Sequence, residues 1–314
     1  MELSINTEQL TKRLKSQKEG NFAIKGFDIK IPPGQLFGLI GPDGAGKTTT
    51  IRILATAMLP TSGNARVGGF DVVSQAEETR PLIGYMPQAF SLYPDLSVIE
   101  NLKFFADLQA VPATRCKERI EELLEFTRLE RFISRPSAKL SGGMRKKLAL
   151  ACALIHEPHV LLLDEPTTGV DPVSRRELWR ILAEVIRQGM TVLVSTPYMD
   201  EAERCHQVGI LYEGKMLATG FPAEMESKLP FDVLEIKAMP RRITRQVIRE
   251  TEGIHRWRPV GDRLRLMVDH PQKMQKSLKA TLKKAGAEVS IMRPAKKTME
   301  DVFIYLVETQ RGNP

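Results

Sequence analysis

The feature that most constrains the fold is a glycine-rich loop ending in Lys-Thr. Residues 41–48, Gly-Pro-Asp-Gly-Ala-Gly-Lys-Thr, match the pattern G-x-x-x-x-G-K-[ST] without a gap. Its glycines let the backbone turn so that successive N–H groups converge on one anion. An apolar strand over 35–40 and a helix over 47–57 flank the loop, which aims the positive helix end at that anion. The pattern predicts a phosphate-binding site made of Gly41, Pro42, Asp43, Gly44, Ala45, Gly46, Lys47, Thr48 and Thr49.

Two carboxylates follow a second apolar strand, predicted over 160–163. Asp164 is expected to hold Mg²⁺ together with the Thr48 hydroxyl, while Lys47 reaches the β- and γ-phosphates of a nucleotide. Glu165 is the candidate general base for an attacking water. Many buried strands end in Asp, so this pair is informative only because the phosphate loop accompanies it.

Short β-like runs alternate with helical runs through residue 228, which predicts an α/β fold with a largely parallel sheet. Residues 27–31 alternate apolar and polar, as in a half-exposed edge strand. The stretch of about 90–156 is expected to be helical, with Ser97 and Glu100 in capping-box spacing. A further strand is expected over 191–195 and helices over 172–187 and 199–205.

The positive charge lies in the last quarter of the chain. Residues 1–230 carry 28 Lys+Arg and 28 Asp+Glu, whereas residues 231–314 carry 18 and 10. This break predicts a domain boundary near 229–231, followed by a β-α-β-β-α-β-α order that is typical of a small ferredoxin-like α+β domain. The domain has few aromatic residues and no nucleic-acid motif, so a solvated mixed-charge surface is favoured over nucleic-acid or anionic-lipid binding.

Composition bears on the cellular compartment and on membrane association. The three cysteines are widely spaced, which favours a reducing compartment over a disulfide scaffold. The longest apolar run is 148–155, far short of the roughly 20 residues needed to span a bilayer. We expect a cytoplasmic chain; at a membrane it would be peripheral on the inner face, and another polypeptide would supply the span.

The segment Leu140-Ser-Gly-Gly-Met144 extends this interpretation to a family. It resembles the signature motif of ABC transporter ATP-binding subunits, which other P-loop enzymes lack, and it lies at the family's distance before Asp164. The resemblance covers about 1–228 and implies an ABC-type P-loop NTPase domain with a helical subdomain at about 90–156. Residues 231–314 form a basic accessory domain, in which Thr298-Met-Glu-Asp-Val-Phe303 is similar to the closing motif of drug-exporter and ABC-2-type ATPases.

The resemblance also implies roles and partners. Gln88 resembles the Q-loop glutamine, which touches Mg²⁺ and the attacking water, and Gly169-Val-Asp171 resembles the D-loop at a dimer seam. Two such domains bind two ATP molecules head to tail, so that Ser141, Gly142 and Gly143 of one chain contact the nucleotide of the other. ATP and Mg²⁺ are the implied cofactors, and an integral-membrane transporter subunit and a second ATPase subunit are the implied partners; nucleic acid is not.

Two positions depart from the family. Pro197 stands where the family has a switch histidine, and proline has neither a side-chain donor nor an N–H. We therefore expect hydrolysis at this chain's own site to be slow or absent, unless Glu165 alone suffices. Near the N-terminus, Leu14 stands where the family has an adenine-stacking aromatic residue; Phe22 is a substitute or a core residue, and the sequence leaves both open.

The expected function is the ATP-binding subunit of an ABC exporter. Two alternatives remain open at this point. One is a soluble ABC ATPase acting on ribosomes, which the single cassette and the absence of a coiled-coil insert disfavour. The other, motivated by Pro197, is a regulatory subunit with weak hydrolysis that pairs with a paralogue, so homodimer and heterodimer are both open.

Overall fold

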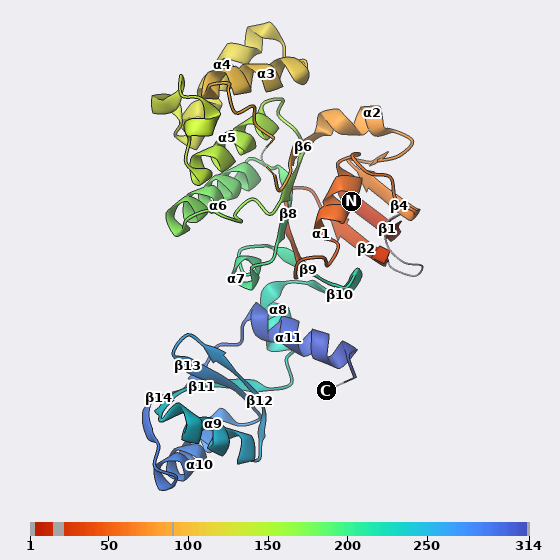
Figure 1. Ribbon diagram of the computed structural model, residues 1–314. Helices are drawn as coiled ribbons and strands as arrows, with labels where there is room; N and C mark the ends of the chain where they lie inside the picture. The colour runs from red at the N-terminus through yellow and green to blue at the C-terminus, as the bar shows by residue number, and fades with distance from the viewer. Residues whose placement is uncertain (1–3, 15–21, 90, 313–314) are drawn as a thin grey trace. The chain divides into compact units, whose positions relative to one another are not determined.

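The computed structural model describes residues 4–14, 22–89 and 91–312 (Figure 1). The chain divides into two compact units, Met1–Pro222 and Ala223–Pro314, here called unit 1 and unit 2. Residue 90, where the helical subdomain was expected to begin, lies outside the described residues. Among the described residues, no helix combines the length and the apolar character that crossing a membrane would require.

Unit 1 is built on a six-stranded sheet of order β10-β9-β3-β8-β7-β6. All of its neighbouring strands pair in parallel except β9 and β10. Strands β3, β7 and β8 are buried along their whole length, as expected for parallel strands covered on both faces. The expected largely parallel sheet is confirmed, with strands β3 (Leu36–Ile40), β6 (Ile83–Met86), β7 (Val160–Asp164), β8 (Thr191–Thr196), β9 (Gln207–Tyr212) and β10 (Lys215–Gly220).

A second, antiparallel sheet in unit 1 has the strand order β2-β1-β4-β5. Its edge strand β2 buries Phe27, Ile29 and Ile31 and exposes Asp28 and Lys30, which confirms the alternation expected for 27–31. The other three strands were not foreseen. The sheet consists of β1 (Ile5–Arg13), β2 (Phe22–Ile31), β4 (Ser62–Val67) and β5 (Phe70–Asp71).

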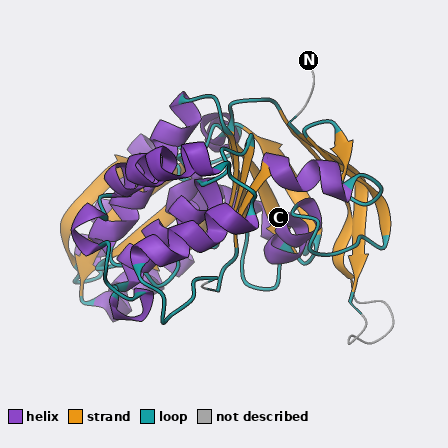
Figure 2. Cartoon of the chain, turned by 90° about the horizontal axis from the view of Figure 1, so that it is seen from above, coloured by secondary structure: helices purple, strands orange, loops and turns teal. Residues whose placement is uncertain are grey.

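Figure 2 draws the helices of the chain in purple and its strands in orange. One apolar core joins side chains of both sheets to those of α1, the helix after the phosphate loop. Helices α3, α4 and α5 confirm most of the helical stretch expected at about 90–156, but residues 128–141 hold only short 3₁₀ turns. Ser97 and Glu100 form a complete capping box at the first of these helices, α3. The helices are α1 (Lys47–Leu54), α2 (Ala76–Thr79), α3 (Val98–Leu108), α4 (Ala113–Thr127), α5 (Gly142–Leu154), α6 (Pro172–Arg187) and α7 (Met199–Ala202).

After a short helix, α8, unit 2 has the β-α-β-β-α-β order of a ferredoxin-like domain, followed by one helix. Its antiparallel sheet has the order β12-β13-β11-β14, and α9 and α10 share its apolar core. The predicted order is therefore confirmed. The elements are α8 (Pro222–Ser227), β11 (Asp232–Met239), α9 (Arg241–Glu250), β12 (Ile254–Val260), β13 (Arg263–Val268), α10 (Pro271–Lys284), β14 (Glu288–Ala295) and α11 (Met299–Gln310).

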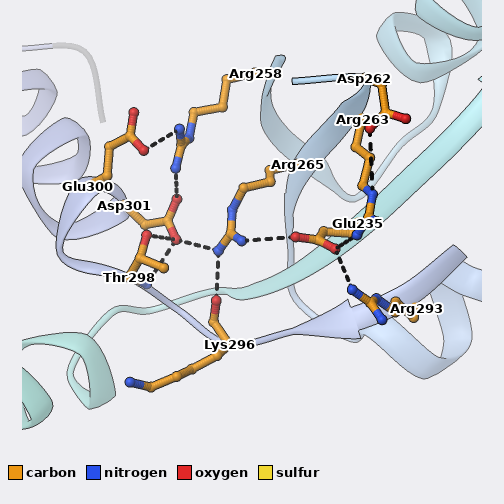
Figure 3. Close-up of polar contacts among 10 residues, drawn as sticks. All are labelled: Glu235, Arg258, Asp262, Arg263, Arg265, Arg293, Lys296, Thr298, Glu300 and Asp301. Carbon is orange, nitrogen blue, oxygen red and sulfur yellow. Dashed lines mark hydrogen bonds and ion pairs between the residues drawn. The ribbon is translucent and has the colours of Figure 1, made fainter. Parts of the chain in front are cut away.

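Ion pairs gather on the sheet of unit 2 where α11 begins (Figure 3). Asp301, fully buried in the first turn of α11, accepts hydrogen bonds from Arg258 at 2.9 Å and Arg265 at 2.8 Å. The Arg265 guanidinium also lies 3.3 Å from a carboxylate oxygen of Glu235. Burial alone would raise the pKa of Asp301, but the hydrogen bonds and charges of Arg258 and Arg265 outweigh it and lower that pKa.

The charge of unit 2 is unevenly mixed. Helices α9 and α10 carry nine basic residues and one acidic residue, a difference equal to the net charge of +8 of residues 231–314. The remainder of residues 231–314 is balanced and holds the ion pairs just described. The mixed-charge surface expected from sequence thus holds for the sheet but not for the helical layer, whose exposed basic residues are Arg241, Arg242, Arg245, Arg249, Lys273, Lys276, Lys279, Lys283 and Lys284.

Candidate functional site

The phosphate loop joins β3 to α1 and is tightly packed at two of its glycines. A Cβ atom at Gly41 would collide with the carbonyl oxygen of Leu211, and one at Gly46 with that of Ala23. Gly44 and Gly46 also adopt left-handed backbone conformations, with φ of 77° and 109°. Glycine at 41 and 46 is thus required by close backbone approach, whereas at 44 it is favoured by conformation alone.

Lys47, the first residue of α1, is buried within the loop that precedes it. Its Nζ donates hydrogen bonds to the carbonyl oxygens of Gly41 at 2.8 Å and Pro42 at 3.1 Å. The same nitrogen lies 3.3 Å from Glu165 Oε1. The loop cation and the candidate base therefore face one another across the site.

Asp164 ends β7 and meets the loop through its side chain. Its Oδ1 accepts hydrogen bonds from Thr48 at 3.0 Å and from Ser195 at 2.7 Å. Burial raises the pKa of this carboxyl group, while the bonds from Ser195 and Thr48 oppose the rise. Its Oδ2 is buried and has no hydrogen-bond partner among the described residues. A hydroxyl beside an unpartnered buried carboxylate oxygen is a donor set that suits Mg²⁺ with nucleotide phosphates.

Glu165 follows Asp164 in a left-handed backbone conformation, with φ of 48°. Its backbone N–H donates to Ser195 Oγ at 3.0 Å. Its Oε2 accepts from the Gln88 side-chain amide at 2.9 Å and from Thr168 at 3.2 Å. The structure thus brings the two predicted catalytic residues, Glu165 and Gln88, into direct contact.

A cavity of about 580 Å³ opens over these groups. Its lining includes both candidate residues for adenine contact, Leu14 and Phe22. Phe22 is partly exposed, begins β2 and lines the cavity, and it does not belong to the apolar core cluster. The cavity is lined by Leu14, Phe22, Ala23, Lys25, Asp43, Gly44, Gly46, Lys47, Thr48, Thr49, Gln88, Glu165 and Glu213.

The signature segment lies apart from this cavity and begins helix α5. Ser141 is the N-cap and accepts a hydrogen bond from the backbone N–H of Met144 at 3.2 Å. A Cβ atom at Gly143 would collide with Ser174 near the start of α6, so only glycine permits this approach. Among the described residues, Ser141, Gly142 and Gly143 do not line the cavity, so within one chain they do not join the phosphate loop.

Pro197 lies where the family's switch residue was expected. It follows Thr196 at the end of β8, and the carbonyl oxygen of Thr196 accepts a hydrogen bond from Gly41 N–H at 3.4 Å. The side chain of Thr196 donates to Glu201 Oε2 at 2.6 Å, and Glu201 is fully buried. Glu201 also accepts from Arg175, Trp179 and Thr167, which fixes the turn after Pro197 against α6.

The histidines of unit 1 lie at the amino ends of the strands, opposite the carboxyl ends at which the site is formed. His206 Nδ1 accepts a hydrogen bond from the N–H of Leu36, the first residue of β3. His156 contacts the carbonyl oxygen of Ile83, the first residue of β6, and His159 directly precedes β7. Since the site is formed at the carboxyl ends of these strands, no histidine of unit 1 is placed to substitute for the missing one.

Sequence reasoning missed three polar contacts of the site. Ser195 is paired with Asp164 across the parallel strands β7 and β8, and Thr168 follows Glu165 by three residues. Ser195 could have been found, because the carboxyl ends of neighbouring parallel strands meet at one edge. Lys146 of α5, whose Nζ donates to the carbonyl oxygen of Gln88 at 3.1 Å, carried no such signal.

Comparison with known proteins identifies the family. A family model described as ABC transporter matches residues 24–168. The chain is 38% identical over 288 residues to the Nod factor export ATP-binding protein I of Cupriavidus metallidurans, covering 90% of this chain and 91% of that protein. It is 51% identical over 200 residues to the probable multidrug ABC transporter ATP-binding protein YbhF of Escherichia coli, covering 64% of this chain. The aligned part is only 35% of that longer relative.

Solved structures agree with this. The cbiO1 protein from Clostridium perfringens, part of the ABC transporter complex cbiONQ, superposes with a TM-score of 0.66 at 26% identity, over 80% of this chain and 94% of its own. The dimeric post-hydrolysis state of the ATP-binding cassette MJ0796 bound to ADP and Pi superposes with a TM-score of 0.64 at 26% identity, over 69% of this chain and 98% of its own. The chain belongs to the ABC transporter family, as one of its ATP-binding proteins.

Proposed function

We propose that the chain binds and hydrolyses ATP and couples this cycle to transport by a separate membrane subunit, most simply an exporter. The observation that carries the proposal is the meeting of Lys47, Asp164 and Glu165 at one edge of the parallel sheet. The relatives named for Nod factor export and multidrug transport support the direction of transport. In this assignment the chain works on the cytoplasmic face of the membrane.

The site residues divide the work between binding and chemistry. The loop N–H groups and Lys47 hold the phosphates, and Thr48, Asp164 and Gln88 hold Mg²⁺, which neutralises phosphate charge when bound. Glu165 accepts a proton from the attacking water, and Gln88 orients Glu165 through their hydrogen bond. Phe22 offers the aromatic ring that packs against the adenine of ATP.

A second subunit completes the site in this proposal. Ser141, Gly142 and Gly143 lie at a helix N-terminus, which presents a hydroxyl and free N–H groups to an anion. Since they do not line their own chain's cavity, they are assigned to the nucleotide of a facing cassette, supplied by a second copy or by a paralogue. Native mass spectrometry of the complex separates these cases: one ATPase species in two copies excludes the paralogue.

We also assign a role to each of the two domains. Residues 1–228 act as the ATPase domain, with the helical subdomain at about 90–156. Residues 231–314 act as an accessory domain that contacts the second subunit. Removal of 231–314 is expected to weaken dimerisation; unchanged dimerisation and ATPase activity would contradict this role.

Pro197 sets the expected turnover of this chain's own site. Loss of one preorganised donor to a developing charge costs about 10²–10³ in rate. No histidine of unit 1 lies at the carboxyl edge to replace it. We therefore assign slow hydrolysis to this chain's own site. Where a paralogue is present, the intact signature segment of this chain completes the faster site on that paralogue.

The test is the Pro197→His variant, assayed for ATPase activity with the membrane subunit present. Turnover is expected to rise while ATP affinity changes little, because Thr196 and Glu201 already fix the turn. Phosphate release by the unaltered protein at the rate of the variant would refute the slow-site assignment. Failure to bind ATP at all, or to co-purify with a multispan protein, would refute the transporter assignment.

A further inference from the structure

Lys146 is a buried cation that the proposed chemistry does not use. It is the fifth residue of α5 and is only 4% exposed. Lysine is rarely buried because its ammonium group loses strong hydration. Its Nζ donates a hydrogen bond to the backbone carbonyl oxygen of Gln88 at 3.1 Å. The long side chain therefore reaches from the signature helix to the segment that follows β6.

The surroundings of Lys146 identify which charges compensate its burial. Burial lowers the pKa of Lys146, while the negative charges of Asp164 and Glu165 favour its ammonium form. The cation thus lies in the field of the two carboxylates at the end of β7.

Gln88 is held at both ends. Its backbone carbonyl oxygen accepts from Lys146, and its side-chain amide donates to Glu165 Oε2 at 2.9 Å. No second residue is needed between α5 and Glu165, because Gln88 contacts both. A displacement of α5 relative to β7 is therefore transmitted to Glu165 through one residue.

Lys147, the next residue of α5, anchors this helix to α6. Lys147 Nζ lies 2.5 Å from Glu177 Oε2 of α6, and Gly143 packs directly against Ser174 of α6. Two neighbouring lysines of α5 thus reach in different directions, one to the following helix and one into the site. The signature helix is tied to both the candidate base and the helix that follows the D-loop segment.

We propose that Lys146 is a positioning residue, which sets Gln88 against Glu165 by holding the Gln88 backbone to the signature helix of the same chain. The expected effect of Lys146 on turnover rests on the proposed function. Its expected effect on the position of Gln88 rests on the geometry alone. Lys146 does not line the nucleotide cavity. Its effect on the site passes through Gln88 to Glu165, so we expect the chemical step to change more than nucleotide binding.

The experiment compares Lys146→Met, Lys146→Arg and a control, Lys117→Met, in the full-length protein. Lys117 lies on α4 with its side chain 88% exposed. Hydrogen–deuterium exchange of the nucleotide-free protein is measured for the peptide containing Gln88 and for the peptide containing β7. Steady-state ATPase kinetics give kcat and KM for the same proteins.

In Lys146→Met, exchange around Gln88 is expected to accelerate while β7 stays protected. We expect kcat to fall about 100-fold, the loss typical of a catalytic group displaced by about 1 Å, with KM for ATP unchanged. Lys146→Arg retains a cationic donor and is expected to restore most of the protection and activity. The control is expected to match the unaltered protein in both measurements.

Three outcomes overturn the inference. Unchanged exchange at Gln88 in Lys146→Met means that Lys146 does not hold this segment. A rise in KM with kcat preserved means that it acts on nucleotide binding. Faster exchange in β7 as well as at Gln88 means that its role is general stability. If the unaltered protein lacks ATPase activity, the proposed function fails, but the exchange at Gln88 still decides the role of Lys146.

Discussion

Lys47 Nζ lies 3.3 Å from Glu165 Oε1, and both side chains are almost fully buried, with exposures of 4% and 5%. The cation assigned to the nucleotide phosphates is thus paired with the carboxylate assigned to the attacking water. Phosphate oxygens must compete with Glu165 for Lys47 when a nucleotide enters. The pair therefore links ATP binding to the release of the candidate base.

Replacement of Glu165 by glutamine separates binding from turnover. The amide cannot accept the proton of the attacking water, so ATPase turnover is expected to fall by about 10²–10⁴. The amide also removes the negative charge that competes for Lys47, so ATP affinity is expected to rise. Equilibrium binding of a fluorescent ATP analogue and phosphate release report the two effects. Weaker binding in the variant would show that Glu165 does not compete with phosphate.

The Thr48 hydroxyl distinguishes metal binding from packing. It donates to Asp164 Oδ1 at 3.0 Å, beside the unpartnered Oδ2 atom of the same carboxylate. Thr48→Val keeps the shape but removes the oxygen, and the Mg²⁺ concentration at half-maximal ATPase activity is expected to rise about 10- to 100-fold. Thr48→Ser keeps the oxygen and serves as the control. An equal Mg²⁺ requirement in both variants would remove Thr48 from the metal site.

The candidate site was largely predictable because its parts obey one rule of parallel sheets. Gly41 follows β3, Asp164 ends β7 and Thr196 ends β8, and the carboxyl ends of parallel strands share an edge. The loop pattern supplied the anion site, and Asp164 followed from an apolar run that ends in an acid. The same rule places Ser195 beside Asp164, although its hydroxyl had not been considered.

The rest depends on contacts that local patterns do not encode. Strand β1 has irregular registers around residues 8–10, and Gln9 adopts a left-handed conformation with φ of 47°. This breaks the alternation by which a strand is recognised. Lys146 was hidden for a different reason: a lysine in a helix is ordinarily solvated, and its burial is explained by distant contacts, namely the Gln88 carbonyl oxygen and the charges of the carboxylates at the end of β7.

Substitutions at two glycines of the phosphate loop distinguish a requirement for close packing from a requirement for a left-handed backbone conformation. A Cβ atom at Gly41 would collide with the Leu211 backbone, which cannot move without displacing β9. Gly41→Ala is therefore expected to abolish ATP binding. At Gly44 nothing lies within 4 Å of a Cβ atom, so Gly44→Ala is expected to cost only about 1 kcal/mol for its left-handed conformation and to keep ATP binding. Calorimetric titration with ATP compares them, and equal losses would contradict the distinction.

Asp301 is expected to stabilise unit 2 in a pH-dependent manner. Removing one partner of a buried ion pair costs about 3 kcal/mol, so Asp301→Asn should lower the free energy of unfolding of unit 2 by about that amount at neutral pH. The arginines lower the pKa of Asp301 in the folded state, so its contribution is complete above the unfolded pKa of about 3.9. It is lost as the pH falls through the lower, folded pKa.

The difference between Asp301→Asn and the unaltered protein should therefore be constant from neutral pH down to about pH 5 and should shrink below about pH 4. Urea unfolding followed by the fluorescence of Trp257, in a Trp179→Phe background, reports unit 2 alone, since the chain has two tryptophans. Asp262→Asn is the matched control, because Asp262 pairs with Lys237 at 2.6 Å but is 56% exposed. A loss of stability in the control equal to that in Asp301→Asn would show that burial does not set the strength of these pairs. A difference that persists unchanged below pH 3 would show that folding does not lower the pKa of Asp301.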